Sequence, residues 1–422
     1  MDRTSAGLRL GRLTVSVSER VTPAERLRRY AELAVRVGAN VQPGQDVVVT
    51  CLVEHVDVAR EVAREAYKAG ADHVIVLYND LHLRRAAIEL GPESEIGWSA
   101  PYLLDWIKRW STENPALISL TGNPSPTLLS DLDPALVGRS DPREIRAAFL
   151  EHIQGAHINW TIVAAPNTGW ATEVFGEPDM DRLWDAVAVS TRLDDPDPVA
   201  AWRAHTEMLQ ARADALNERA FDAIRYRGPG TDLIVGLIPG SKWRCATFET
   251  AGGISHVPNL PTEEVFTSPD WRRADGHVRS TYPLVASGTK VTGLEFRLED
   301  GKIVEVDAEN GAEVIRAQLE TDEQAPYLGE LALVDGSSPV KQTGLVFSDT
   351  LFDENATCHI AFGAGLPDTL GRAVPPDELL EAGLNVSAIH TDFMVGGEDV
   401  DVDGLDDDGA ATSIIRGDAW QL

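Results

Sequence analysis

Residues 46–78 read DVVVTCLVEHVDVAREVAREAYKAGADHVIVLY. The run from Asp46 to Val53 is apolar and of strand length, as expected for a strand that is buried on both faces. An amphipathic helix follows over 55–70, and a second apolar strand over 73–78. A strand, a helix and a strand in this order predict two parallel strands joined by a helical crossover.

The same alternation extends in both directions from this unit. A helical pattern begins at Pro23 and ends near Gly38, and it is preceded by a polar extension with one short strand pattern over 13–17. Downstream, helices are expected over 101–110, 142–153 and 180–191, and strands over 116–120 and 158–163. The N-terminal half is therefore predicted to be an open parallel α/β layer. It has no glycine-rich dinucleotide or phosphate-binding motif, which favours a scaffold or dimerisation role.

The character of the chain changes after a long helix predicted over 199–219. Short strand patterns with frequent glycine turns follow at 221–226, 232–237, 294–298 and 303–306. The tetrapeptide Glu299-Asp-Gly-Lys302 between the last two is a hairpin signal. We therefore expect two domains, an α/β domain over 1–218 and a mainly antiparallel β domain over 219–422.

Charge and cysteine content limit the class of protein. The formal net charge of −30 argues against nucleic-acid binding and against an anionic membrane, and it favours cationic groups such as a substrate amine. The three cysteines are widely spaced without a C-x-x-C pair, so we expect no disulfide framework and a reducing cytoplasm. Neither a signal peptide nor a membrane span is expected, because long apolar runs are absent from the sequence.

Four short patches in the C-terminal half supply carboxylates and two histidines, which are the ligands of divalent-metal sites. They are Thr262-Glu-Glu-Val-Phe266, Gly329-Glu-Leu-Ala-Leu333, Asp353-Glu-Asn-Ala-Thr-Cys-His359 and His390-Thr-Asp392. Each patch alone has an ordinary structural explanation, such as a surface ion pair or a half-buried histidine. The hypothesis is that the four converge on one site.

The spacing of residues within each patch indicates which side chains can point toward a common site. His390 and Asp392 share one face if 389–394 is a strand. His359 is read as helical, and Glu354, five residues earlier, can join it only from the turn that leads into that helix. Glu330 opens a buried strand and needs a cationic partner, an arginine or a metal. Of the consecutive Glu263 and Glu264, only one can face a pocket on an extended segment, and spacing does not choose between them.

At these patches the sequence resembles the thermophilic aminopeptidases, the group of two-metal exopeptidases that includes aminopeptidases T and S. The matching stretches are Asn259-Leu-Pro-Thr-Glu-Glu-Val-Phe266, Tyr327-Leu-Gly-Glu-Leu-Ala-Leu333, Thr350-Leu-Phe-Asp-Glu-Asn-Ala-Thr-Cys-His-Ile-Ala361 and His390-Thr-Asp-Phe-Met394. Weaker matches extend the likeness from about residue 24 to the end of the chain. The resemblance implies an α/β domain and a β-rich metal-binding domain, assembled as a homodimer around an enclosed cavity.

The resemblance also implies a ligand set. Carried over by motif, the metal ligands are Glu264, Glu330, Glu354, His359, His390 and Asp392, with Glu264 rather than Glu263 in the site. Glu264 and Glu330 are the expected catalytic residues, Glu330 as a bridge between two ions and Glu264 as a candidate proton shuttle. One position departs from the family: a tyrosine that is thought to assist catalysis is replaced by Leu366, which cannot donate a hydrogen bond.

The expected activity is that of a metal-dependent aminopeptidase, which removes the N-terminal residue of a peptide with a water activated by two Zn²⁺, Co²⁺ or Mn²⁺ ions. A second hypothesis uses His359, His390 and Asp392 alone as a two-histidine, one-carboxylate site for Fe(II). Ring-cleaving dioxygenases of the 2,5-dihydroxypyridine type resemble the same fold. A third possibility is a binding protein without catalysis, which the intact ligand set disfavours.

Overall fold

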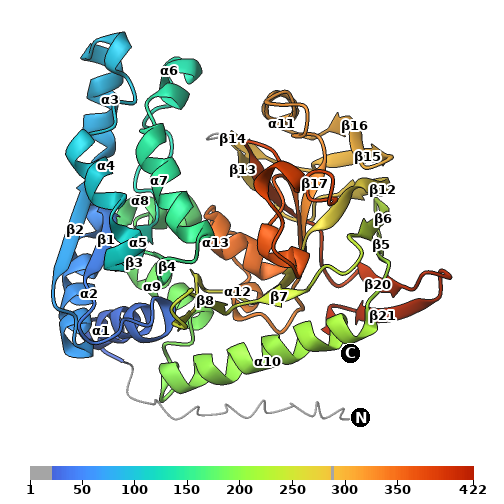
Figure 1. Ribbon diagram of the computed structural model, residues 1–422, viewed down its shortest axis with the longest axis horizontal. Coiled ribbons are helices and arrows are strands. Elements are labelled where there is room, and N and C mark those ends of the chain that lie inside the picture. The colour runs from blue at the N-terminus through green and yellow to red at the C-terminus, as the bar shows by residue number, and fades with distance from the viewer. Residues whose placement is uncertain (1–20, 287–288) are drawn as a thin grey trace, which may run out of the picture.

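The computed structural model describes residues 21–286 and 289–422, and Figure 1 shows two parts joined along a long helix. The first part is built on a parallel five-stranded sheet with the strand order β10-β4-β3-β1-β2. Its strands are β1 (Val47–Leu52), β2 (Val74–Asn79), β3 (Ala116–Thr121), β4 (Trp160–Ala164) and β10 (Asn259–Leu260). The strand–helix–strand unit predicted from residues 46–78 forms β1, α2 and β2, with β1 and β2 parallel.

Helices cover both faces of this sheet. Successive residues of β1 point to opposite faces and most are apolar, so each face needs a helical layer to bury them. Val47 and Val49 pack in the main core with α1 and α2, whereas Val48 packs with residues of α4, α5 and α7. The helices of this part are α1 (Pro23–Leu33), α2 (Val56–Ala69), α3 (Leu81–Leu90), α4 (Pro101–Ile107), α5 (Trp110–Glu113), α6 (Pro134–Arg139), α7 (Arg143–Gln154), α8 (Thr168–Phe175) and α9 (Met180–Ser190). The predicted α/β layer is therefore present.

The second part contains two larger antiparallel sheets. An eight-stranded sheet has the order β16-β15-β12-β6-β5-β20-β21-β22, and a five-stranded sheet has the order β19-β18-β17-β11-β7. The strands of the first are β5 (Ala223–Gly228), β6 (Thr231–Leu237), β12 (Pro269–Arg279), β15 (Glu295–Glu299), β16 (Lys302–Asp307), β20 (Asp401–Leu405), β21 (Ala411–Arg416) and β22 (Ala419–Trp420). Those of the second are β7 (Arg244–Cys245), β11 (Val265–Thr267), β17 (Leu328–Leu333), β18 (His359–Gly363) and β19 (His390–Met394).

Smaller elements complete this part. Two-stranded ribbons are formed by β8 (Phe248–Glu249) with β9 (Ser255–His256) and by β13 (Leu284–Ala286) with β14 (Thr289–Val291). Its helices are α11 (Ala312–Leu319), α12 (Pro339–Gln342) and α13 (Thr350–Asp353). The predicted hairpin joins β15 to β16 and places Asp300 and Gly301 at positive φ of 47° and 85°, as a tight hairpin turn requires.

Helix α10 (Pro198–Arg219) ties the two parts together, and Figure 1 shows it running beneath both. Asp197 caps its first turn by accepting a hydrogen bond from the Ala200 amide, and Pro198 occupies the first helical position. The helix contacts α1 in the first part and β7 and β11 in the second. Strand β10 lies beyond the predicted boundary at residue 218 but pairs with β4, so the chain returns to the first sheet.

His359 was expected on a helix, but it opens strand β18. The preceding helix α13 has only four residues, and Thr357, with φ −164° and ψ 173°, already turns the chain into an extended conformation. The strand predicted over 13–17 lies outside the described residues. Among the helices in the described part of the chain, none combines the length and the apolar character needed to cross a bilayer.

Candidate metal centre

The five-stranded antiparallel sheet brings five of the six predicted ligands together from four neighbouring strands or their ends. Glu264 lies just before β11, Glu330 in β17, His359 in β18, and His390 and Asp392 in β19. The register aligns Glu330 with Ala361 and Ala361 with Asp392, so these three residues share one face of the sheet. Because the side chains of a strand alternate, His359 and His390 project from that same face.

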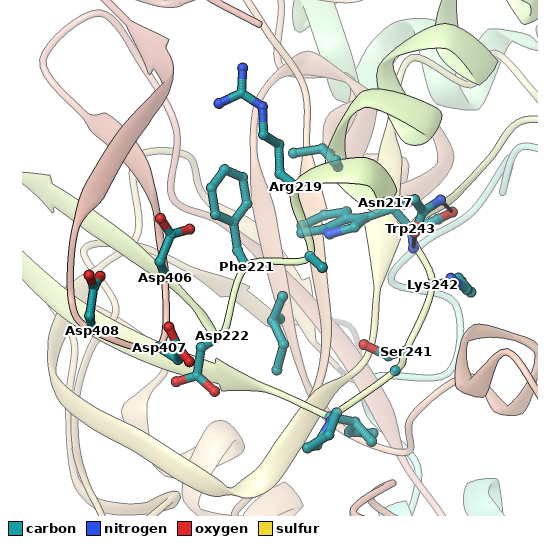
Figure 2. Close-up of a pocket in the computed structure, with 16 residues that line it drawn as sticks. Asn217, Arg219, Phe221, Asp222, Ser241, Lys242, Trp243, Asp406, Asp407 and Asp408 are labelled. Carbon is teal, nitrogen blue, oxygen red and sulfur yellow. Dashed lines mark hydrogen bonds between the residues drawn. The ribbon is translucent and has the colours of Figure 1, made fainter.

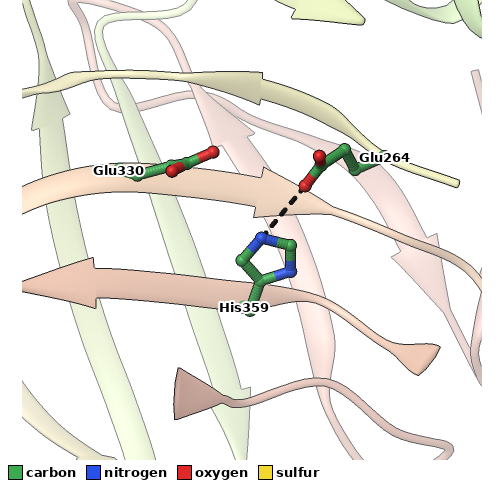
Figure 3. A group of neighbouring side chains, drawn as sticks. All are labelled: Glu264, Glu330 and His359. Atoms are coloured by element: carbon green, nitrogen blue, oxygen red, sulfur yellow. Dashed lines mark ion pairs between the residues drawn. The ribbon is translucent and has the colours of Figure 1, made fainter. Parts of the chain in front are cut away.

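Two groups of three side chains result, and Glu330 belongs to both. The first triad is Glu264, Glu330 and His359, and the second is Glu330, His390 and Asp392. Within each triad one ligand atom per residue lies within 4.8 Å of the others. Figure 3 shows the first triad, with the Glu264 and His359 side chains directed toward each other and Glu330 beside them on the adjacent strand.

Within the triads, imidazole nitrogens lie close to carboxylate oxygens. His359 Nε2 lies 3.0 Å from Glu264 Oε2, and His390 Nε2 lies 3.1 Å from Glu330 Oε2 and 3.3 Å from Asp392 Oδ1. His390 Nδ1 lies 2.8 Å from the carbonyl oxygen of Ala364. If Nδ1 donates its hydrogen there, Nε2 presents a lone pair to the site, which is how a metal-binding imidazole is oriented.

Glu354, the sixth predicted ligand, belongs to neither triad but lines the same cavity. It lies on the 3₁₀ turn η4 (Glu354–Ala356), where the sequence had required it to be if it was to reach His359. Burial raises the pKa of Glu354 well above its usual range, and the nearby Asp392 and Glu264 carboxylates raise it further. The structure thus places five predicted residues in two triads and the sixth beside them.

The electrostatics of the site are those of buried carboxylates with too few cations. Burial raises the pKa of Glu330, and the Glu264 and Asp392 carboxylates oppose its ionisation as well. Burial alone would lower the pKa of His359, but hydrogen bonding and attraction to Glu264, with help from Asp392 and Glu354, raise it to about 10. Each carboxylate therefore favours a positive charge close by.

This donor set fits divalent metal ions. Within residues 21–286 and 289–422, the only side chains that pair as cations with these carboxylates are the two histidines. Four carboxylates carry four negative charges, which two divalent ions would balance. Glu264 Oε2 is buried and is faced by His359 Nε2 at 3.0 Å. A divalent ion would supply the positive charge that a protonated His359 otherwise provides to this buried carboxylate.

The two consecutive glutamates have different surroundings. Glu264 lines the cavity and belongs to the first triad. Glu263, which is equally buried, is held by the guanidinium group of Arg192, with Nη1–Oε1 and Nη2–Oε2 distances of 2.6 and 2.9 Å. Of the two glutamates, Glu264 thus faces the cavity, whereas Arg192, which no sequence motif connects with the site, holds Glu263.

The triads lie in a cavity of about 630 Å³ that both parts of the molecule line. Trp160 and Ile158 of the α/β part and Phe248, His256 and Phe266 of the β part provide much of its apolar wall. The α/β part, which was predicted to have a scaffold or dimerisation role, therefore also helps to shape the cavity. Leu366 lines the cavity too, and its backbone amide donates to Ser268 Oγ at 2.8 Å.

A second cavity, of about 620 Å³, lies at the C-terminal end of α10 and is shown in Figure 2. Asp222 and the run Asp406 to Asp408 give it an acidic rim, and Lys242 and Arg219 also line it. Asp222 is already paired with Arg273 at 2.5 Å. Histidine and cysteine are absent from the residues that line it, so it lacks the mixed nitrogen and oxygen donors of the first cavity.

Comparisons with known proteins agree with this geometry. The sequence profile of the thermophilic metalloprotease (M29) family matches residues 24–420. Aminopeptidase T of Thermus thermophilus is 44% identical over 400 residues, which cover 93% of this chain and 98% of that protein. Aminopeptidase 2 of Geobacillus stearothermophilus is 36% identical over 402 residues, with 93% and 97% covered.

A solved structure is also similar over nearly the whole chain. Wild-type AmpT from Thermus thermophilus superposes with a TM-score of 0.88 at 42% sequence identity. The match covers 94% of this chain and 100% of that one. Sequence and fold thus point to the same group of relatives.

Proposed function

Because this chain belongs to the thermophilic metalloprotease (M29) family, we propose that its two triads hold two divalent metal ions with Glu330 shared between them. The chain is a metal-dependent aminopeptidase, like the relatives that match it over most of its length. The observation that carries the two-ion proposal is the membership of Glu330 in both triads within one cavity. Imidazole and carboxylate donors suit Zn²⁺, Co²⁺ or Mn²⁺.

When bound, a pair of such ions lowers the pKa of a water molecule and polarises a carbonyl group. The protein side chains orient and move protons around that chemistry. Glu330 fixes the two halves of the site relative to each other, and Ala364 holds the His390 ring through Nδ1. Glu264, whose carboxylate belongs to the first triad, is the candidate carrier of a proton from the attacking water to the leaving amine.

The proposed substrate is a small peptide with a free α-amine. The net charge of −30 favours the approach of a positively charged amine. The apolar wall formed by residues such as Trp160 and Phe266 suits an uncharged side chain. We also propose that the enzyme works as a cytoplasmic homodimer. The resemblance to the family supports the dimer, and three buried free cysteines suit a reducing compartment.

Metal analysis combined with a peptidase assay tests the proposal. Protein purified without chelators should contain about two divalent ions per chain, in line with a two-metal site. Hydrolysis of leucine p-nitroanilide should stop after chelation and return with Zn²⁺, Co²⁺ or Mn²⁺. The N-acetylated substrate, which lacks the free amine, should not be cleaved. One iron per chain with no amide hydrolysis would instead support the mononuclear dioxygenase.

The variant Glu264→Ala provides a second discriminating result. It should abolish hydrolysis if Glu264 is both a ligand and the proton carrier. A mononuclear iron site built from His359, His390 and Asp392 does not include Glu264, so the same change would have a far milder effect there. Retention of most of the peptidase activity by this variant would contradict the proposed role of Glu264.

A further inference from the structure

We infer that Arg192, His205 and Asn355 are positioning residues, which fix the segment Thr262–Glu264 so that Glu264 faces the metal centre. This inference rests on the proposed function, because it assigns Glu264 to a metal site. None of the three residues belongs to a triad. They act on the backbone and on the side chain of the neighbouring Glu263, and the contacts of each can be followed separately.

Arg192 holds the Glu263 carboxylate through two hydrogen bonds in a region that is almost closed to solvent. The side chains are 15% and 5% exposed, and both guanidinium ends are used. Arg192 is itself fixed, because its guanidinium carbon lies 5.0 Å from the centre of the Trp202 ring. The planar fork of an arginine makes such a paired contact directional, so the Glu263 side chain has one orientation.

His205 of α10 connects this ion pair to the backbone of the same segment. Its Nδ1 lies 3.1 Å from Arg192 Nη2, and its Nε2 lies 2.8 Å from the carbonyl oxygen of Thr262. Arginine is always a donor, so Nδ1 accepts and Nε2 carries the hydrogen that Thr262 receives. Burial and the charge of Arg192 lower the pKa of His205 to about 3, which agrees with this neutral form.

Asn355 fixes the segment from the opposite side. Its Oδ1 accepts a hydrogen bond from the Glu263 amide at 2.7 Å, and its Nδ2 donates to the Leu351 carbonyl at 2.9 Å. The residue is fully buried and follows Glu354 directly in the chain. One amide side chain thus connects the segment that carries Glu264 to the turn that carries Glu354.

These contacts determine where Glu264 points. Consecutive side chains of an extended segment face opposite sides, so anchoring Glu263 toward Arg192 directs Glu264 toward the cavity. A buried ion pair contributes little net stability compared with well-packed apolar residues, which makes stability alone a weak explanation for this one. Groups behind metal ligands commonly set ligand orientation, and losing one typically weakens metal binding about 10- to 100-fold.

The test compares two buried arginines in matched surroundings. Arg212 also has a side chain that is 15% exposed, pairs with a buried carboxylate, Asp335, at 2.9 Å, and lies 4.7 Å from the centre of a tryptophan ring, that of Trp420. Arg192→Met and Arg212→Met are therefore comparable changes. The charge of Arg212 also reaches His205 and Glu263, but its hydrogen bonds go to Asp335 and not to the segment Thr262–Glu264. For each variant, the Co²⁺ dissociation constant is measured by chelator competition, the visible spectrum of the Co²⁺ protein is recorded, and the melting temperature is measured without metal.

Both variants should lower the melting temperature of the metal-free protein. Only Arg192→Met should weaken Co²⁺ binding, by about 10- to 100-fold, and shift the visible absorption bands. Arg192→Lys should give an intermediate affinity, because lysine keeps the charge but not the paired geometry. If Arg192→Met does not fold, Glu263→Gln gives the same readouts with little change of shape.

Three outcomes would overturn the inference. Wild-type Co²⁺ affinity and spectrum in Arg192→Met, or in Glu263→Gln if it has to be used, would show that the contacts do not position Glu264. An equal loss of affinity in Arg212→Met would show that the effect comes from a lost positive charge or from general destabilisation, and not from the hydrogen bonds between Arg192 and Glu263. Failure of the wild-type chain to bind Co²⁺ would overturn the proposed function itself, and the positioning role with it.

Discussion

Glu330 is the residue on which most of the proposed chemistry depends, because its carboxylate belongs to both triads. Its side chain is 8% exposed and burial raises its pKa. Glutamine has nearly the same shape but no charge, and its amide cannot replace a shared carboxylate. A substitution of Glu330 by glutamine therefore tests whether the site needs the negative charge of this side chain or only its volume.

Glu330→Gln should weaken metal binding by at least about 100-fold, because removing even a group behind a ligand costs about 10- to 100-fold. Metal content after dialysis, measured by atomic emission, checks this. Glu249→Gln is the control, since the exposed Glu249 lines the same cavity outside both triads. Equal metal retention in the two variants would contradict the assignment of Glu330.

His256 should give the metal-free protein a measurable dependence of stability on pH. Burial lowers its pKa to about 4, and its Nε2 has no hydrogen-bond partner. The unfolded chain, with an ordinary pKa of 6.5, therefore binds the proton first. The contribution of the neutral, buried His256 to the free energy of unfolding is complete above pH 6.5 and is lost as the pH falls toward 4. At about pH 5 the free energy of unfolding has fallen by about 2 kcal/mol for this reason.

His256→Leu removes this titrating group. The free energy of unfolding of the variant, relative to wild type, should rise by about 2 kcal/mol between about pH 7 and about pH 5. Urea unfolding of both proteins in the presence of a chelator measures it, and contributions from other titrating groups cancel in the difference. A difference that does not change with pH would show that the imidazole is accessible to protons in the folded state.

Among the elements, the neighbouring strands β17 and β18 set the distance between Glu330 and His359. The sequence predicted a strand at β17 but a helix at β18. His390 and Asp392 were expected on one strand face, and the structure has this feature. Glu330 was expected to open a buried strand, but β17 begins two residues earlier, at Leu328, and Glu330 lies inside it. His359 was assigned to a helix because residues 355–362 read as a helix that follows a turn at Asp353 and Glu354. Strand pairing between Ala332 and His359 determines the structure there, and single-sequence periodicity does not reveal such a long-range contact.

Gly329 permits the close approach of β17 to the end of β18. A Cβ atom at this position would lie 2.2 Å from the carbonyl oxygen of Ala364 and 2.5 Å from that of Gly363. Gly329→Ala should therefore displace the strand next to Glu330, lowering stability by about 1–3 kcal/mol. It should also weaken metal binding, because the two triads depend on this spacing.

Denaturant unfolding and chelator competition on Gly329→Ala measure the two effects. Gly138→Ala in α6 is the control, because a Cβ atom there meets nothing within 4 Å. That change should be neutral or stabilising by about 0.5–1 kcal/mol, as expected for alanine in a helix. Wild-type stability and affinity in Gly329→Ala would mean that β17 can shift without disturbing the site.

On the scale of the whole molecule, the sequence predicted the classes of the two halves more completely than the connections between them. The alternating strands and helices and the change of character after α10 could be read locally. The return of β10 to the first sheet and the ion pair between Arg192 and Glu263 join residues far apart in sequence. Such contacts leave no local pattern, so the shared cavity and the anchoring of Glu263 emerged only from the structure.

The net charge of −30 is a property of the whole molecule with a kinetic consequence. An acidic protein attracts cationic substrates over a distance set by the ionic strength. Leucine p-nitroanilide carries one positive charge on its amine, and lysine p-nitroanilide carries two. Between about 20 mM and about 200 mM NaCl, kcat/KM should fall several-fold for the lysine substrate and distinctly less for the leucine substrate.

Steady-state assays at several salt concentrations, with metal occupancy verified at each, measure this difference. Attraction acts on the encounter, so the salt dependence should appear in kcat/KM and leave kcat nearly constant. A parallel fall for both substrates would point to a general effect of salt on the enzyme. Equal kcat/KM at all salt concentrations would mean that the acidic surface is too far from the cavity entrance to direct the substrate, and the charge would then act mainly on solubility.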